Sequence, residues 1–219
     1  MGELILIAAS GLAREVLAMV RSSGEYDVVG LLDDDVEMTG VSVDGAPVLG
    51  IIDDAARYTH AFVLVCIGSG KVREAVVERL TAQGLTEDRY ATAVDPSVQY
   101  PDGCHVGRGS ILLRNVTLTA AVTLGSHVVA MPSVTFTHDD DVADFATFAA
   151  GVSLGGGVRI GRAAYLGMNS SVRERTSVGA YATVGMGAAV LSNVPDGQTW
   201  VGVPAHEIDR DSFRVGGMS

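Results

Sequence analysis

The chain has 219 residues, a length that allows two small domains or one large one. Apolar residues make up 47% and charged residues 19%, which supports a packed core and excludes a disordered chain. Fifteen Lys and Arg residues stand against 26 Asp and Glu, and the net charge of −11 argues against nucleic acid and anionic membrane surfaces as partners.

Targeting signals and cysteines narrow the class of protein further. No apolar run approaches the length of a membrane span, and the N-terminus lacks the basic region and cleavage site of a signal peptide. The two cysteines, Cys66 and Cys104, exclude a disulfide framework and a Cys-rich zinc site. We therefore expect a cytoplasmic protein that has no membrane partner.

Residues 1–90 alternate strand and helix patterns. Buried strands are predicted at 4–9, 28–32 and 61–67, because each is a short apolar run that ends in Gly, Ser or Asp. Ser10 is a candidate N-cap for a helix that stops at Gly24, and apolar residues at helical spacing predict a second helix that stops near 84. Strands that alternate with helices predict a small, incomplete Rossmann-like α/β domain with a parallel sheet.

From Val94 to Pro195 the chain follows a six-residue period over 17 consecutive hexads without insertion. Every first position is apolar, seven second positions are Gly, and sixteen of the 17 fifth positions are small residues. A short strand cannot bury its aliphatic side chain alone, but three strands per coil and coil on coil form one continuous core. The period predicts a left-handed parallel β-helix, with Gly placed where φ is positive.

The order of the motifs along the chain resembles that of a known protein family. AASGLAREV, LLDDD and VCIGSG precede the hexads, which contain THDDDVADF, LGGGVRIG, LGMNSSV and VGMGAAV and end in NVPDG and VGVPA. Together they resemble the NeuD/PglD-like sugar O-/N-acetyltransferase family of hexapeptide-repeat enzymes. The resemblance implies a nucleotide-sugar-binding domain at 1–90, an acetyl-CoA-binding catalytic β-helix at 91–205 and a C-terminal tail at 206–219. It also implies a homotrimer with active sites between subunits.

His138 is the candidate general base, because acetyl transfer needs a proton removed from the attacking amine or hydroxyl and a neutral imidazole suits that step. The resemblance gives Asp139 the role of the acidic neighbour that raises the basicity of the imidazole. It also gives the backbone N–H of Gly156 the role of donor to the thioester oxygen. The alternatives are an ordinary solvated turn histidine, and a zinc site between subunits. His105, His127 and His138 occupy different hexad positions, which argues against zinc.

Two neighbours of His138 depart from the expected pattern. Asp140 holds a fifth position, where all other hexads have a small residue, and we expect the chain to bulge there so that the carboxylate is solvated. Thr147 stands nine residues after His138, where the family often has a second histidine near the acetyl group. A threonine hydroxyl can donate a hydrogen bond there but cannot shuttle a proton.

Two ligand sites are expected. Ser10, Gly11 and Leu12 open a helix directly after a strand, which suits a diphosphate. Asp33 and Asp34 end the second strand, where carboxylates accept hydrogen bonds from a ribose or base edge, and Gly68 follows the third. Their alternatives are a plain β–α turn, a solvated acidic turn and a turn glycine. For acetyl-CoA the resemblance indicates, besides Thr147, these positions: Gly156, Met168 and Met186.

These observations predict an acetyl-CoA-dependent acetyltransferase, without a metal, that acts on the amine of a nucleotide-linked amino sugar in a surface-glycan pathway. One alternative is an O-acetyltransferase that acts on sialic acid or another sugar hydroxyl. An alternative of another class is a non-catalytic trimeric scaffold that binds nucleotide-sugars.

Overall fold

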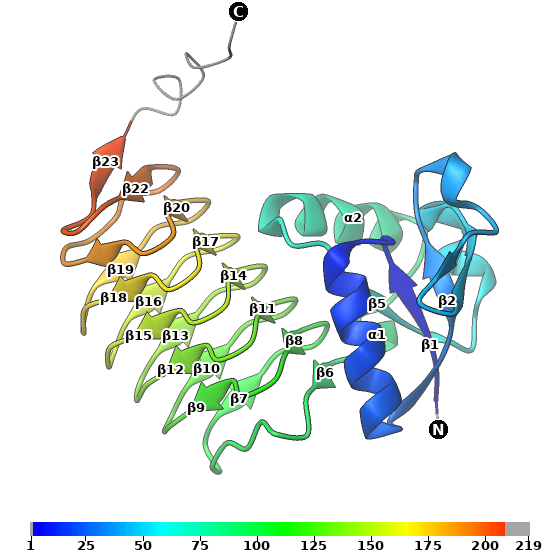
Figure 1. Cartoon of the computed structure of the whole chain (residues 1–219), viewed down its shortest axis with the longest axis horizontal. Coiled ribbons are helices and arrows are strands. Elements are labelled where there is room, and N and C mark those ends of the chain that lie inside the picture. The colour runs from blue at the N-terminus through cyan, green and yellow to red at the C-terminus, as the bar shows by residue number, and fades with distance from the viewer. Residues whose placement is uncertain (1, 209–219) are drawn as a thin grey trace, which may run out of the picture.

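The computed structural model describes residues 2–208. A small α/β part is followed by a long three-sided prism that carries the chain away from it (Figure 1). The elements of the α/β part are, in chain order, β1 (Gly2–Ile7), α1 (Gly11–Ser23), β2 (Tyr26–Leu32), η1 (Val36–Met38), β3 (Ser42–Val43), β4 (Ala46–Gly50), η2 (Ile52–Arg57), β5 (Phe62–Val65), α2 (Gly70–Ala82) and η3 (Glu87–Arg89).

The α/β part is one five-stranded sheet in the order β3-β4-β2-β1-β5, and its strands are parallel except β3. The three predicted strands and both helices are present, whereas the hairpin of β3 and β4 was not predicted. Alternate residues of β1 separate the two faces: Leu4 and Leu6 pack with α1, and Ile5 and Ile7 lie in the cluster that contains Val76 of α2. One helix therefore covers each face of the sheet.

The prism is a left-handed parallel β-helix with three parallel sheets, which we call faces 1, 2 and 3. Face 1 contains β7 (His105–Val106), β10 (Thr123–Leu124), β13 (Asp141–Val142), β16 (Arg159–Ile160) and β19 (Ser177–Val178). Face 2 contains β6 (Ala93–Val94), β8 (Ile111–Leu112), β11 (Val129–Ala130), β14 (Thr147–Phe148), β17 (Tyr165–Leu166), β20 (Thr183–Val184), β22 (Thr199–Val201) and β23 (His206–Ile208). Face 3 contains β9 (Thr117–Leu118), β12 (Thr135–Phe136), β15 (Ser153–Leu154), β18 (Ser171–Val172) and β21 (Ala189–Val190).

The six-residue period matches this geometry. First-position residues from Leu112 to Val190 and most fifth-position residues are buried in one apolar cluster. Tyr100 is the exception among first positions: it is exposed, because residues 95–104 run as a loop without a strand before the regular coils begin at His105. The predicted repeat is thus confirmed except at its first turn.

The prediction that the repeat glycines stand where φ is positive is wrong for the second positions. The seven second-position glycines do not have positive φ; a Cβ on any of them would collide with the next coil. The left-handed backbone instead lies at fourth positions, where it is mostly adopted by other residues: Asn115, Ala121, His127, Ser133, Asp139, Phe145, Ala163, Asn169, Arg175 and Tyr181. Glycine is therefore needed here for close packing of coils rather than for backbone freedom.

The α/β part packs on face 2 of the prism. Ile111 and Val129 of that face share an apolar cluster with residues of β1 and α1, and α2 lies beside the turns that join faces 1 and 2 (Figure 1). The predicted tail at 206–219 lies outside the described residues except for β23, which pairs with β22. Within residues 2–208 no helix combines the length and the apolar character needed to cross a bilayer.

Candidate active site

His138 lies on edge A of the prism, the edge between faces 3 and 1, in the turn from β12 to β13. Its Nδ1 is 2.8 Å from Oδ2 of Asp139, which adopts a left-handed backbone with φ of 64°. The side chains of both residues are 67% exposed. With the Nδ1–H donated to the carboxylate, Nε2 is left as the nitrogen that accepts a proton.

Gly156 lies against the imidazole ring, one coil further along edge A. A side chain at this position would collide with Cε1 and Nε2 of His138. The turn is aligned by the N–H of Gly157, which donates to the His138 carbonyl at 2.8 Å. Among the described residues the Gly156 N–H has no acceptor, so a donor and a proton-accepting nitrogen lie side by side.

The expectation that Asp140 is solvated is wrong. Its side chain points into the prism and is only 1% exposed. Oδ2 accepts a hydrogen bond from the Thr137 N–H, and Oδ1 accepts one from the Val158 N–H, both at 2.8 Å. Burial raises the pKa of Asp140 to about 6, although these bonds and the nearby His138 oppose that rise.

Met168 and Met186 are exposed and lie one coil apart on a different edge, edge C, between faces 2 and 3. A single chain therefore does not bring the two methionines together with His138 and Gly156. Exposed apolar side chains on this edge leave a surface for an apolar group such as a pantetheine arm.

The α/β part and His138 lie on opposite sides of the prism. Edge A joins faces 3 and 1, whereas the α/β part packs on face 2, the face across the triangular section from that edge. A ligand on the carboxyl ends of β1, β2 and β5 is therefore separated from His138 of its own chain by the body of the prism (Figure 1).

The β1–α1 turn has the form that was predicted for an anion site. Ser10 caps α1: its Oγ accepts from the Ala13 N–H and donates to the Cys66 carbonyl at 2.6 Å. A Cβ at Gly11 would meet nothing within 4 Å, so the helix N-terminus is open. The side chain of Leu12 is 6% exposed and packs in the core, so a ligand could meet this residue only through its backbone.

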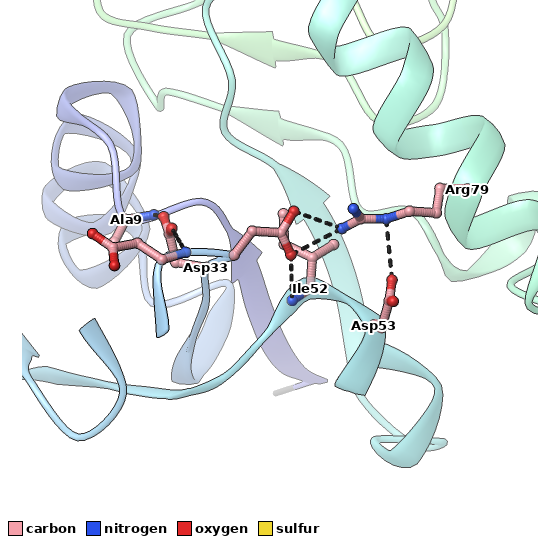
Figure 2. Close-up of polar contacts among 7 residues, drawn as sticks. Ala9, Asp33, Ile52, Asp53 and Arg79 are labelled. Atoms are coloured by element: carbon pink, nitrogen blue, oxygen red, sulfur yellow. Dashed lines mark hydrogen bonds and ion pairs between the residues drawn. The ribbon is translucent and has the colours of Figure 1, made fainter. Parts of the chain in front are cut away.

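The two aspartates after β2 already have partners within the chain (Figure 2). Asp33 accepts hydrogen bonds from the N–H groups of Ala9 and Asp35, so it shapes the loops around the β1–α1 turn. Asp34 is held by both its oxygens to Arg79 of α2, which also pairs with Asp53. This ion-pair network ties α2 to the loops after β2 and β4, and the part of Asp34 in substrate binding stays a prediction.

Gly68 follows β5, and a Cβ there would meet nothing within 4 Å, so a ligand has room beside it. Its carbonyl accepts a hydrogen bond from the Thr147 hydroxyl at 2.8 Å. Thr147 is fully buried on face 2, away from edge A. The expectation that it contributes to the acetyl-CoA site does not fit, because its hydroxyl is used to join the α/β part to the prism.

Arg73 of α2 is fully buried at this junction and was missed by the sequence reasoning. Its guanidinium donates to the carbonyls of residues 67, 68, 127, 145 and 146 and to Thr147 Oγ1. Burial lowers its pKa to about 10, so it stays charged at neutral pH. An arginine on the same helix face as Val76 and Leu80 was the available signal, since arginine is almost never buried without partners.

A cavity of about 470 Å³ lies between α2 and edge B, which joins faces 1 and 2. His127 lines it, stacked on Phe145 with centroids 5.0 Å apart and packed edge-on against Tyr90. Burial lowers the pKa of His127 to about 4, so it is neutral and packs as an aromatic residue. Within residues 2–208 no group of three or more His, Cys, Asp or Glu side chains forms a metal cluster.

Comparisons with known proteins agree with this architecture. Residues 3–80 match the model of the PglD N-terminal domain. GDP-perosamine N-acetyltransferase of Escherichia coli O157:H7 is 31% identical over 188 residues, which is 83% of each chain. The acetyltransferase domain of PglB from Neisseria gonorrhoeae in complex with acetyl coenzyme A has a TM-score of 0.86 at 27% identity and covers 94% of this chain and 98% of its own. PerB from Caulobacter crescentus in complex with CoA and GDP-perosamine has a TM-score of 0.86 at 25% identity and covers 95% and 98%.

A left-handed β-helix preceded by an α/β domain, with a histidine–aspartate pair above an unpaired backbone N–H, defines an acetyltransferase of the hexapeptide-repeat class. The chain belongs to the NeuD/PglD-like family of sugar acetyltransferases. The predicted family, fold class and type of enzyme are confirmed.

Proposed function

We propose that this enzyme transfers an acetyl group from acetyl-CoA to the amine of a nucleotide-linked amino sugar, with His138 as the general base. The observation that carries the proposal is the geometry of edge A, where Nε2 of His138 lies beside the free N–H of Gly156 and Nδ1 is held by Asp139. Relatives that cover most of the chain act on, or are bound to, CoA and GDP-perosamine, which supports this choice of donor and acceptor.

The residues of edge A fit both halves of the transfer. Nε2 of His138 accepts the proton that the acceptor amine loses as it attacks, and the ionised Asp139 stabilises the imidazolium that results. The Gly156 N–H donates to the oxygen that gains negative charge during the attack. Bound acetyl-CoA supplies a thioester with a good leaving group, and its release as a thiol takes up a proton from the imidazolium.

The α/β part holds the nucleotide in this proposal. The open N-terminus of α1 at Gly11, after the Ser10 cap, presents free N–H groups to a diphosphate, and Gly68 leaves room beside the adjacent strand. Both lie at the carboxyl ends of parallel strands, where open α/β sheets bind ligands. Asp33 contributes by holding the Ala9 N–H and so shaping the turn.

The separation of the two sites supports a homotrimer with active sites between subunits. The sugar end of a nucleotide-sugar on one α/β part reaches edge A only if that edge belongs to a neighbouring subunit. The exposed Met168 and Met186 of edge C then line the same intersubunit cleft, where they pack against acetyl-CoA. We also propose that the enzyme works in the cytoplasm, in a surface-glycan pathway. This part of the proposal is argued from the sequence alone.

The proposed reaction is tested with acetyl-CoA and a panel of nucleotide-linked amino sugars, with thiol release as the signal. We expect turnover with at least one member, GDP-perosamine being the first to try, and mass spectrometry should show one acetyl group on nitrogen. Turnover only with sialic acid or another sugar hydroxyl would replace N-acetylation by O-acetylation. No thiol release above buffer with any acceptor, combined with tight nucleotide-sugar binding, would favour a binding scaffold instead.

A further inference from the structure

Asp140 breaks the pattern of the repeat at one point only, beside the proposed base. Fifth positions of the hexads point into the prism and carry small residues in the sixteen other hexads. At Asp140 a carboxylate occupies this inward place and is 1% exposed. Burying a charge in an apolar core is unfavourable, so a buried carboxylate next to His138 indicates a functional role that offsets the lost stability.

The carboxylate joins the two turns that hold the proposed catalytic groups. Oδ2 accepts from the N–H of Thr137, the residue before His138, and Oδ1 accepts from the N–H of Val158, two residues after Gly156. Both hydrogen bonds are 2.8 Å long. One side chain therefore fixes the distance between the turn that carries the imidazole and the turn that carries the oxyanion donor.

The prism contains an internal comparison for these bonds. Ser110 holds a fifth position on edge B, where its hydroxyl accepts from the N–H of Val128, eighteen residues ahead, at 3.0 Å. That bond corresponds to the one from Val158 to Asp140, which also spans eighteen residues. The Ser110 hydroxyl also donates to the Gly125 carbonyl at 3.1 Å. A hydroxyl is thus enough to join successive coils, and what the carboxylate adds is a bond within its own turn, from the Thr137 N–H.

We propose that Asp140 is a positioning residue for acetyl transfer: it fixes His138 over Gly156 through the Thr137 N–H, and its negative charge helps to stabilise the imidazolium. This inference rests on the proposed role of His138. The titratable groups that face the Asp140 carboxyl are His138 and Asp139. A charged His138 favours the ionised form of Asp140, whereas Asp139 disfavours it.

The pH dependence of folding stability shows whether the Asp140 carboxylate is a cost to folding at neutral pH. The pKa of Asp140 is about 6 in the folded protein against an ordinary value of 3.8, so the protonated form is the one that folding favours. Its contribution to stability is fully present below pH 4 and is lost as the pH rises through 6. At pH 7 the ionised carboxylate is therefore a cost to folding, which the hydrogen bonds from Thr137 and Val158 offset only in part.

The test compares Asp140→Ser with wild type and with Ser110→Ala. Serine keeps the coil-to-coil bond but loses the one to Thr137. We expect kcat at pH 7 to fall roughly 10- to 100-fold with KM for both substrates nearly unchanged. The melting temperature at pH 7 should be equal or higher, and the gain in stability of the wild type between pH 7 and 5 should be reduced. Ser110→Ala should lower the melting temperature and leave kcat unchanged.

A second readout does not depend on turnover. The chain has five histidines, and the ring signal of His138 is assigned by its loss in His138→Ala. We expect the NMR titration midpoint of His138 to fall in Asp140→Ser and in Asp140→Asn, because each removes a negative charge beside the imidazole. An unchanged midpoint together with kcat within twofold of wild type would overturn the proposal for Asp140. Full turnover in His138→Ala would instead overturn the proposed function.

Discussion

His138→Ala is expected to lower kcat by at least about 100-fold, because it removes the imidazole nitrogen beside Gly156 that is proposed to accept the proton of the attacking amine. KM for acetyl-CoA and for the nucleotide-sugar should change little, since the imidazole is exposed and contributes to the chemical step more than to binding. Steady-state thiol release at saturating concentrations of both substrates measures the effect.

The matched control for this prediction is His105→Ala, which removes another exposed histidine of the same prism, on face 1 and two coils before Asp141. It should keep the kcat and the melting temperature of the wild type. Turnover of His138→Ala within a few-fold of wild type would remove His138 from its role as base and leave it as a solvated turn residue.

Arg73→Met is expected to lower the free energy of unfolding by about 3 kcal/mol or more, because it removes the guanidinium that donates to the carbonyls of Ile67, His127 and Phe145. For a chain of this length that corresponds to a fall in melting temperature of roughly 10 °C. The KM for the nucleotide-sugar should rise as well, since Arg73 holds the carbonyl of Gly68 beside the proposed nucleotide site. Differential scanning calorimetry and the kinetics of any folded fraction measure both effects.

Arg79→Met is the control within the same helix. Arg79 pairs with Asp34 and Asp53, and these side chains are substantially exposed to solvent, so the loss should be below about 1 kcal/mol (Figure 2). Equal stability losses for the two variants would mean that the buried contacts of Arg73 do not hold the α/β part on the prism.

The β-helix was predictable because its period is dictated by local packing. Each hexad packs a first-position and a fifth-position side chain inside the prism, so apolar and small residues recur at these positions along the sequence. The hairpin of β3 and β4 was missed because β3 has only two residues and Pro47 interrupts the strand pattern of β4. The role of the second-position glycines was misjudged because close contact between coils eighteen residues apart leaves no mark in the local sequence.

The candidate site shows the same limit. His138 and Asp139 were found from neighbouring positions in the chain, and their contact is local. Asp34, Thr147 and Arg73 have partners 18 to 79 residues away. Which polar groups meet depends on the packing of the α/β part for Asp34, and on how that part packs on the prism for Thr147 and Arg73. Asp140 was recognised as an exception to the repeat, but its two backbone partners became visible only in the folded turn.

The account depends most on the claim that each active site combines edge A of one subunit with the α/β part of another. Subunit complementation tests it with His138→Ala, which lacks the base, and Gly11→Asp, which places a carboxylate at the open helix N-terminus without disturbing packing. Each variant alone should be inactive. Differently tagged and co-purified, the mixed trimers should recover about one third of wild-type activity, because one of the three shared sites in each mixed trimer receives both intact halves. Mixed assemblies that stay as inactive as either variant alone would contradict the account.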